Sequence, residues 1–336
     1  MEENRKRKQT KAGPLRILIN SSTKFDYSIW NLSHLDVKIL KLRNSTYNPL
    51  HILCFEQLLN APSILNLAEM YKPMSGWPLT PQEYGEKQHK LNIAFMNSDR
   101  NLLDQSINTK HWMKFDIMLS IEYLKTFEFF QCLKLSDRII LAKHVTVIIQ
   151  SMTFSFTSFE NNSDCFRTPD GYFIDFKNTI DLCKIFTRGE EKKTVSCVRN
   201  HLKSSQNVMG FLIREKLTNT EYILLKAIAI CDPIFDLSEE GRKIVCETRQ
   251  NYSKTLFKYC QIVNGVRNGP SRFVKLLSYI NLLIQHQKSL QKFMTIMKMY
   301  AVQKSPKTIE DSVLDQTLMC GLYKLKASIV FMRRIT

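Results

Sequence analysis

The chain has 336 residues and a formal net charge of +17, and 44% of its residues are hydrophobic. A chain of this length and apolar content can bury a core in one large domain or in two ordinary ones. Glycine and proline are scarce, at ten residues each, which disfavours a β-sandwich or a glycine-rich nucleotide-binding sheet. The composition therefore predicts a helical globular protein.

The basic residues are spread along the chain. Residues 1–11 contribute only five basic and two acidic side chains, so most of the net charge lies elsewhere. Such a charge attracts nucleic acid, anionic membranes or acidic proteins without distinguishing among them. The run RKRK at residues 5–8 is typical of a nuclear import signal or a phosphate-contacting arm, and equally of a solvated chain end. We expect residues 1–25 to form a basic polar tail.

The nine cysteines have no paired spacing, so they predict neither a zinc finger nor any other metal site. No apolar signal segment begins the sequence, and we expect the cysteines to be reduced and mostly buried, in a cytosolic or nuclear protein. No apolar run appears long enough for a membrane span, so no membrane contact is expected. Common catalytic motifs are absent, and His144 is predicted to be a satisfied core histidine. The sequence therefore indicates no enzyme and no cofactor.

Residues 26–110 are predicted to be irregular, with short helical pieces. LHILCFEQLLN has a helical pattern, but the prolines at 62, 73, 78 and 81 prevent long helices after it. Residues 111–330 are predicted to form a helical core. WMKFDIMLSIEYLKTF is apolar almost all round, which is typical of a helix between other layers. Ser136 and Asp137 are predicted to open the next apolar helix as its cap and first-turn acid.

Three further helix boundaries are marked by local signals. TNTE at residues 218–221 has the form of a capping box, and Ser238 is predicted to cap a helix that ends before Gly265. Gly269-Pro270-Ser271 is predicted to open a last long helix that reaches Tyr300. A turn at residues 169–171 supports at most a small β-hairpin. The sum predicts a single all-α domain.

Residues 121–144, IEYLKTFEFFQCLKLSDRIILAKH, resemble the central signature of the nuclear receptor ligand-binding domain: a helix ending in lysine, a short loop and an acid-capped helix. EYILLKAIAICDP, LSEEGRKIVCETRQNYSKTLFKYC and SRFVKLLSYINLL follow in the family's order. RNSTYNP, PSILNLAEMY and GWPLTPQEY are similar to the nematode-expanded branch of that family. The resemblance covers residues 30–300 and implies a three-layer antiparallel helical sandwich.

Two features depart from a full receptor. The zinc-module DNA-binding domain of the family, with its paired cysteines, is absent from this sequence, so contact with DNA would come through a missing domain or a partner. The acid of the family's activation helix has no clear match in TIEDSVLDQTLMCGLYKL, where only Glu310, Asp311 and Asp315 are available.

The resemblance assigns Lys125 and Lys143 to a groove for coregulator helices of the LxxLL type. An amphipathic helix laid in a groove leaves its C-terminal carbonyl groups without intrahelical partners, and a lysine at that end can bind them. The alternative is two independent lysines whose charged heads reach into solvent.

The resemblance also implies an apolar pocket for a small lipophilic ligand. For each residue of this pocket, ordinary core packing is the alternative. Thr157 aligns with the arginine that holds a carboxylate in retinoid-binding relatives, so an acidic ligand is not expected. The pocket candidates are Met113, Asp116, Ile117, Ser120, Val147, Gln150, Ser151, Phe154, Leu290 and Phe293.

The function implied by the resemblance is transcriptional regulation in the nucleus, through coregulator helices and a lipophilic ligand. Homo- or heterodimerisation through residues 271–300 is left open, with Lys275, Tyr279 and Gln287 as the outward residues. The alternative is a receptor-derived interaction module without DNA binding or ligand, which acts by heterodimerisation or sequestration. Direct binding of nucleic acid through the basic tail is a third hypothesis.

Overall fold

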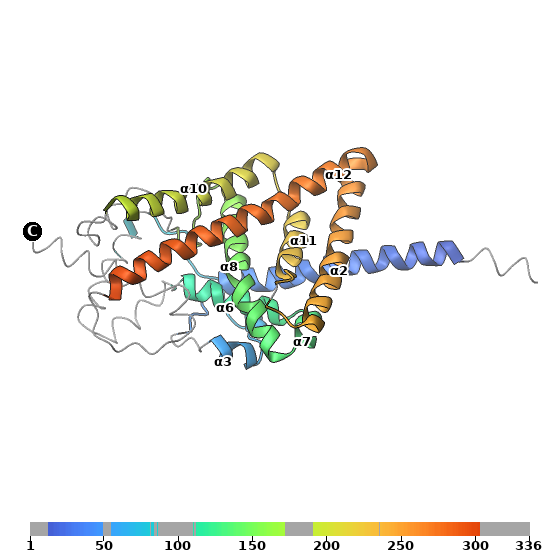
Figure 1. The fold of residues 1–336 in the computed structure, drawn as a ribbon, viewed down its shortest axis with the longest axis horizontal. Coiled ribbons are helices and arrows are strands. Elements are labelled where there is room, and N and C mark those ends of the chain that lie inside the picture. The colour runs from blue at the N-terminus through green and yellow to red at the C-terminus, as the bar shows by residue number, and fades with distance from the viewer. Residues whose placement is uncertain are drawn as a thin grey trace, which may run out of the picture.

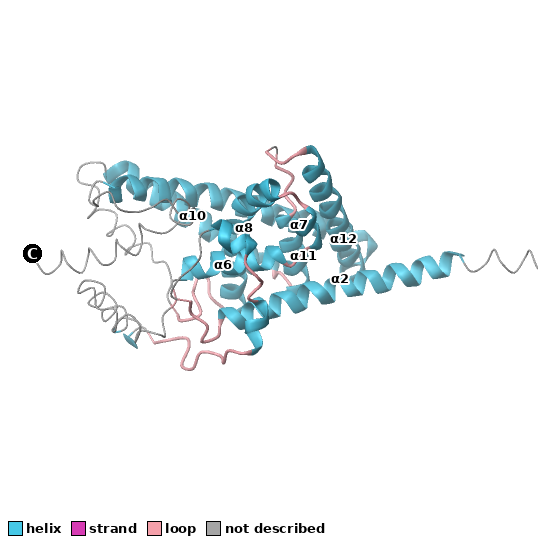
Figure 2. Cartoon of the chain, turned by 90° about the horizontal axis from the view of Figure 1, so that it is seen from below, coloured by secondary structure: helices cyan, strands magenta, loops and turns pink. Residues whose placement is uncertain are grey.

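The computed structural model describes residues 13–49, 55–80, 82–83, 86, 110, 112–171, 191–234 and 236–302. Helices and loops make up this part of the chain, and no strand occurs in it (Figure 2). An isolated antiparallel bridge joins Ser45 and Pro73. The prediction of an all-α fold is confirmed, while the hairpin after residues 169–171 would lie outside the described residues.

The first long helix, α2 (Gly13–Arg43), projects beyond the rest of the domain at its N-terminal end (Figure 1). Its C-terminal part packs against α6 (Trp112–Lys125), α11 (Asn219–Ile230) and the short 3-10 helix η1 (Leu65–Glu69). Residues 13–25 are therefore helical, although the sequence predicted a polar tail up to residue 25. The other predicted boundaries, between residues 110 and 111 and at residue 330, remain predictions.

Two helices form the middle of the domain. They are α8 (Leu135–Glu160) and α11 (Asn219–Ile230), in which every residue from 221 to 230 is buried. On one side lie α2 and α6, and on the other lie α10 (Glu191–Glu215) and the part of α12 (Glu239–Val302) that follows Gly265 (Figures 1 and 2). A central layer needs apolar residues around its circumference, because neighbours cover both of its faces.

Helix α8 is long and apolar enough, by length and composition, to cross a membrane, and the prediction that no such run exists is wrong for this helix. However, 72% of its most apolar window is buried by the rest of the protein. A core helix of a folded domain meets the same criteria, and the packing of α8 between two layers is of that kind.

The start of α8 differs from the prediction. The helix begins at Leu135, and Lys134 at the N-cap makes no side-chain capping bond, so Ser136 lies inside the first turn. The first-turn acid Asp137 accepts hydrogen bonds from the backbone N–H (2.9 Å) and the hydroxyl (2.6 Å) of Ser238. Ser238 in turn accepts from the Gly241 N–H at 3.1 Å, as predicted for a cap. Asp137 thus joins the starts of two helices.

The last long element, α12 (Glu239–Val302), consists of two helical segments that meet at Gly265. Gly265 has φ 79° and ψ 160°, which reverses the chain and confirms the predicted helix end. The second segment already includes Pro270, so its predicted opening at Gly269 is too late. Tyr279 and Gln287 are buried, at 0% and 6% exposure, so the prediction that both face outward is wrong. Their hydroxyl and amide groups bond to Ser155 and His144 of α8.

The cysteines in the described part of the chain are free thiols. Cys231 and Cys260 are buried, Cys132 is exposed, and the others are half-buried. The prediction that cysteines are mostly buried is therefore wrong for the six that the structure describes.

Candidate functional site

Lys125 ends helix α6 and is bound within the protein. Its Nζ atom donates to the backbone carbonyl of Leu58 at 3.1 Å and lies 2.7 Å from the Glu122 carboxylate. The Lys125 side chain is only 7% exposed. A solvated lysine head, which was the alternative for this residue, is therefore wrong for Lys125.

The carbonyl that Lys125 binds belongs to α3 (Phe55–Asn60), a short amphipathic helix packed against α6 (Figure 1). Phe55, Leu58 and Leu59 are buried, and the remaining residues of α3 are exposed. An α-helical carbonyl normally accepts from the N–H four residues later. For Leu58 that residue is Pro62, which has no N–H. Lys125 therefore supplies a donor that the helix itself lacks.

The chain that follows α3 is also fixed to α6. The Ile64 N–H donates to the Glu122 carboxylate at 3.0 Å, and the other oxygen of Glu122 faces Lys125. Glu122 is 1% exposed, so this carboxylate is shielded from water. Lys125 therefore binds the last turn of α3, and Glu122 binds the chain just after it.

Lys143 of α8 lies near the other end of α3. It is exposed, and its Nζ atom is 5.9 Å from the centre of the Phe55 ring. The two predicted lysines thus flank one short helix from two different elements. The acidic side of the groove was sought among Glu310, Asp311 and Asp315. These residues lie outside the part of the chain that the structure describes.

The predicted pocket residues line the interior of α6, α8 and α12. The Asp116 carboxylate forms a two-point ion pair with Arg43 of α2, at 2.7 and 2.9 Å. The guanidinium also lies over the rings of Trp112 and Phe154 and 3.5 Å from the Thr157 hydroxyl. A basic group therefore does lie beside Thr157, but it comes from α2 and Asp116 neutralises it.

The other pocket candidates pack against protein atoms. Ser120 donates to the Asp116 carbonyl at 2.7 Å, and the Phe154 and Phe293 rings lie 5.2 and 5.3 Å from Phe166 and His201. For these residues the geometry is that of core packing. Candidates buried in the same interior are Ile117, Val147, Gln150, Ser151 and Leu290. The side chain of Met113 is not among the described ones.

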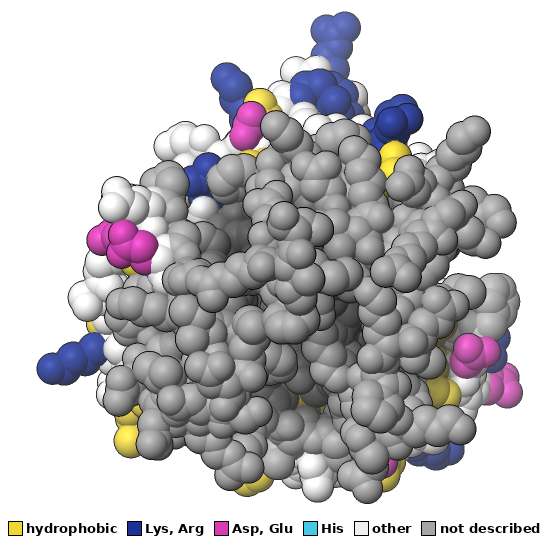
Figure 3. All heavy atoms as spheres, turned by 90° about the vertical axis from the view of Figure 1, so that its left-hand side faces the viewer, with side chains coloured by type: hydrophobic (Ala, Val, Ile, Leu, Met, Phe, Trp, Pro, Cys, Tyr) yellow, Lys and Arg dark blue, Asp and Glu magenta, His cyan; other side chains and the backbone are white. Residues whose placement is uncertain are grey.

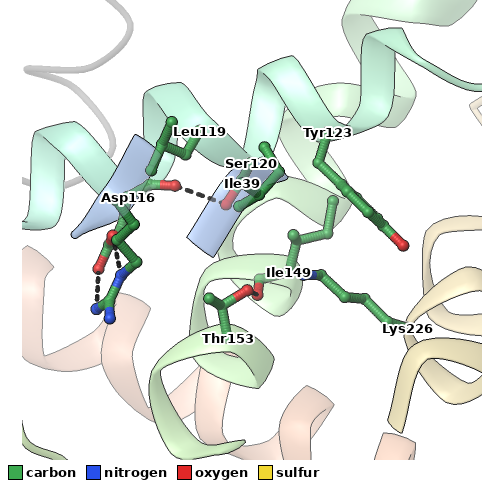
Figure 4. Close-up of a pocket in the computed structure, with 9 residues that line it drawn as sticks. Ile39, Asp116, Leu119, Ser120, Tyr123, Ile149, Thr153 and Lys226 are labelled. Carbon is green, nitrogen blue, oxygen red and sulfur yellow. Dashed lines mark hydrogen bonds and ion pairs between the residues drawn. The ribbon is translucent and has the colours of Figure 1, made fainter. Parts of the chain in front are cut away.

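A cavity of about 10 Å³ lies between α2, α6, α8 and α11 (Figure 4). This volume suits one water molecule at most. Two of its lining residues, Asp116 and Ser120, were pocket candidates. The remaining residues that line it are Ile39, Arg43, Leu119, Tyr123, Ile149, Thr153 and Lys226.

The walls of this cavity carry several buried polar groups. Lys226 is 0% exposed and pairs with Asp36 of α2 at 2.8 Å. The buried hydroxyl of Tyr123 has no hydrogen-bond partner among the described residues, and burial raises the pKa of Tyr123 well above its ordinary value. A water in the cavity would give that hydroxyl a partner.

A third buried cation, Lys110, lies at the C-terminal end of α2. Its Nζ atom donates to the Arg43 carbonyl at 2.8 Å and lies 4.2 Å from the Phe115 ring centre. Burial lowers the pKa of Lys110 to about 7. A lysine here binds orphan carbonyls at a helix terminus, which is the same chemistry that Lys125 offers to α3.

Sequence reasoning missed Arg43, Asp36, Lys226 and Lys110. A signal for the two charges on α2 did exist, because Leu32, Asp36, Ile39 and Arg43 recur at helical spacing and so share one buried stripe. Charges on an apolar stripe indicate buried partners.

His144 is a further correction. It is one-third exposed and its Nε2 atom lies 2.8 Å from Asp232, so it is satisfied but not a core residue. The Asp232 carboxylate also binds Arg249 at 2.9 Å. The hydrogen bond to His144, with the charge of Arg249, lowers the pKa of Asp232.

The surface of the described residues carries basic side chains and no metal site. Seen from the left of Figure 1, Lys and Arg side chains stand out along the upper edge of the protein (Figure 3). Within the described residues, no group of three or more His, Cys, Asp or Glu side chains could hold a metal ion.

The structure is thus that of an all-α domain with a buried central layer of helices, in which α6 ends in a lysine. The family model for the ligand-binding domain of nuclear hormone receptors matches residues 105–300 of this chain. This match covers more than half of the sequence, so the chain belongs to the nuclear hormone receptor family. The resemblance seen in the sequence is confirmed.

The similar curated proteins include receptors of the nematode Caenorhabditis elegans. Nuclear hormone receptor family member nhr-60 is 28% identical over 85% of this chain and 60% of its own length. Family member nhr-153 is 30% identical over 58% of this chain and 45% of its own length. The chain thus spans 60% or less of these two relatives. Among solved structures, the Ultraspiracle ligand-binding domain from Drosophila melanogaster matches 65% of this chain and 77% of its own, with 17% identity and a TM-score of 0.43.

Proposed function

We propose that this chain acts as the regulatory domain of a nuclear-receptor-type transcription regulator in the nucleus, and that it recruits coregulator helices at the face between Lys125 and Lys143. One observation carries the proposal: Lys125 binds the C-terminal carbonyl end of an amphipathic helix whose apolar residues are buried beside it. This is the chemistry that an LxxLL helix would need.

The physical basis is the unpaired end of any docked helix. Its last carbonyl groups lack N–H partners and carry partial negative charge, so a lysine both donates to them and complements the helix dipole. The apolar face of the helix supplies the remaining affinity when it leaves water. Lys143 adds positive charge at the same groove, near the position of Phe55.

A small lipophilic ligand belongs to the same proposal, and it would shift the population of the last helix between docked and free positions. The cavity between α2, α6, α8 and α11 holds one water at most. A lipid-sized ligand would therefore not fit in this particular cavity. Contact with DNA is assigned to a further domain or to a partner.

Charge reversal at the two lysines tests the groove. Fluorescence anisotropy would measure the affinity of LxxLL and corepressor peptides for the wild-type chain, for Lys143→Glu, and for Lys125→Glu/Lys143→Glu. We expect the double variant to bind at least about tenfold more weakly, because Lys125→Glu removes the donor at the C-terminal end of the bound helix and puts a negative charge beside its negative end. Lys143→Glu alone, at an exposed position near the other end of the helix, should change the affinity much less than the double variant and leave folding unaffected.

The matched control is Lys203→Glu/Lys243→Glu, which makes the same charge change at two exposed lysines far from α3 in sequence. It should bind as wild type does. Unchanged binding by the double variant at the groove, or no peptide binding by any form of the protein, would show that the groove assignment is wrong.

A second candidate function is that of an interaction module that acts by heterodimerisation or sequestration. Exposed apolar side chains at the bend of α12 favour it: Ile262, Val263, Val266 and Val274 are 57–78% exposed. Light scattering on the chain alone, and mixed with another receptor ligand-binding domain, would measure the assembly mass. Only monomers in both samples would remove this candidate.

A further inference from the structure

Helix α3 has the sequence pattern of the helices that the groove is proposed to bind. FEQLL at residues 55–59 places apolar side chains at the first, fourth and fifth positions, as LxxLL does. All three of these side chains are buried. The polar residues between and after them are exposed, so α3 presents one apolar face to the protein and one polar face to solvent.

The contacts of α3 follow the same order as its sequence. The first apolar residue, Phe55, is the one beside Lys143, and the carbonyl of the fourth-position Leu58 is the one bound by Lys125. The helix therefore lies with its C-terminal end at Lys125. Pro62 leaves the Leu58 carbonyl free for this bond, since a proline has no N–H to offer it.

We infer that α3 is an internal occupant of the coregulator groove, and that a partner helix of the φxxLL type binds there only after α3 has left. This inference rests on the proposed function of the groove and adds its regulation. Lys125 is the shared element, because its ammonium already divides its donors between the Leu58 carbonyl and Glu122. A second helix end cannot bind at the same place while α3 is docked.

Several features of α3 suit a helix that leaves. It has six residues, and helices of that length are unstable in water unless they are docked. Its main packing partner is α6, whereas the central helix α11 packs against α2, α8 and α12. Short, peripheral elements of this kind open locally at low cost compared with the core.

Covalent attachment makes α3 an effective competitor. A tethered segment has a high effective concentration at its site, so it can fill the groove even when its intrinsic affinity is low. The apparent affinity of a partner is then reduced by the fraction of molecules in which the groove is open. Any change that releases α3 should raise that affinity without a new contact.

The first experiment compares LxxLL peptide binding by the wild-type chain and by Leu58→Ser/Leu59→Ser, which removes two apolar contacts of α3. We expect the variant to bind at least about tenfold more tightly. The matched control, Glu56→Ser/Asn60→Ser, alters the exposed face of α3 and should bind as wild type does. Equal affinity of the wild-type chain and Leu58→Ser/Leu59→Ser would overturn the inference.

Hydrogen exchange on the wild-type chain gives a second measurement that needs no variant. Saturating LxxLL peptide should speed exchange at the backbone amides of residues 58–61, while α11 amides at residues 225–230 stay protected. Slower or unchanged exchange at residues 58–61 with peptide bound would mean that α3 and the partner occupy different places.

A peptide of the chain's own residues 55–63 separates the inference from the proposed function. If no LxxLL peptide binds any form of the protein, the proposed function fails. The own peptide should still bind Leu58→Ser/Leu59→Ser and lose that binding when Lys125→Glu is added. If the own peptide does not bind in that case, the inference about α3 fails as well.

Discussion

Buried ion pairs join α2 to the centre of the domain. Arg43 binds Asp116 of α6, and Asp36 binds Lys226 of α11, with all four side chains at most 5% exposed. Taking such charges out of water is costly, and their attraction offsets the cost only when the geometry is good. A shift of α2 by one turn would leave four charges unpaired. The pairs therefore fix the position of α2 more than they add stability.

The Arg43–Asp116 pair predicts a strongly non-additive mutant cycle. Arg43→Met should lower the free energy of unfolding by about 3–5 kcal/mol, because it leaves the buried Asp116 carboxylate without a partner. Arg43→Met/Asp116→Leu should recover most of this loss, since neither charge of the pair remains. Urea unfolding of the single and double variants measures both effects.

The control for this cycle is Lys41→Met. Lys41 pairs with Glu69 at the surface, where the two side chains are 44% and 63% exposed. Loss of such a pair should change the free energy of unfolding by about 1 kcal/mol or less. A double variant at Arg43 and Asp116 that is no more stable than Arg43→Met would contradict the argument.

Two buried histidines predict the acid sensitivity of the domain. The rings of His201 and His286 stack with centres 5.0 Å apart. Burial lowers the pKa of His201 to about 4, and burial with the neighbouring His201 lowers the pKa of His286 to about 3. In the unfolded chain both have pKa values of about 6.5. Below that pH the unfolded chain binds protons that the folded protein does not, so stability falls as the pH drops from about 6.5 to about 4.

His201→Phe tests this assignment. The phenyl ring can keep the stack on Phe293 but takes up no proton, so the free energy of unfolding should depend less steeply on pH between about 4 and 6.5. At pH 8 the histidines are unprotonated in both the folded and the unfolded chain. Protonation then adds nothing to the difference in the free energy of unfolding between His201→Phe and wild type. His34→Phe, at an exposed position on α2, serves as the control and should leave the slope unchanged. An unaltered slope in His201→Phe would refute the prediction.

At the scale of elements, the bend of α12 depends on one backbone conformation. Gly265 has φ 79° and ψ 160°, a region that is open almost only to glycine. Gly265→Ala should therefore destabilise the protein by about 1–3 kcal/mol, measured by urea unfolding. The cost arises in the backbone, because a Cβ atom there would meet nothing within 4 Å.

Gly210 in α10 provides the opposite case. A Cβ atom at Gly210 also meets nothing within 4 Å, but this residue is in a regular helix. Gly210→Ala should stabilise the protein by about 0.5–1 kcal/mol, because alanine loses less conformational freedom on folding. Equal changes in the free energy of unfolding for Gly265→Ala and Gly210→Ala would show that the positive φ of Gly265 is not what makes alanine unfavourable there.

Helix boundaries set by local chemistry could be predicted from the sequence. The capping box of Thr218 and Glu221, the cap at Ser238 and the end at Gly265 are all present in the structure. Each depends on residues at most four apart. Ser136 was predicted wrongly because α8 begins without a side-chain cap, and its first-turn acid Asp137 is used by a residue 101 positions later.

The site was predictable in part for the same reason. Lys125 and Lys143 could be named because they belong to one continuous stretch of sequence. That α3 lies between them could not be predicted, because Leu58 and Lys125 are 67 residues apart and only the fold brings them together. Pairings over such distances depend on how the layers pack, which no local pattern records.

At the scale of the whole molecule, the net charge of +17 predicts a salt-dependent stability. Like charges spread over a compact surface repel one another, and dissolved salt screens this repulsion. The free energy of unfolding in urea should therefore rise when NaCl increases from about 20 mM to about 300 mM. Exposed pairs such as Lys134–Glu240 weaken at the same time, but each contributes little.

Lys203→Glu/Lys243→Glu lowers the formal charge by four, to +13, and should show a smaller salt effect. Arg43→Met lowers it by one through a buried site and should keep nearly the wild-type salt effect. A protein that loses stability on addition of salt would mean that attractive surface pairs outweigh the repulsion.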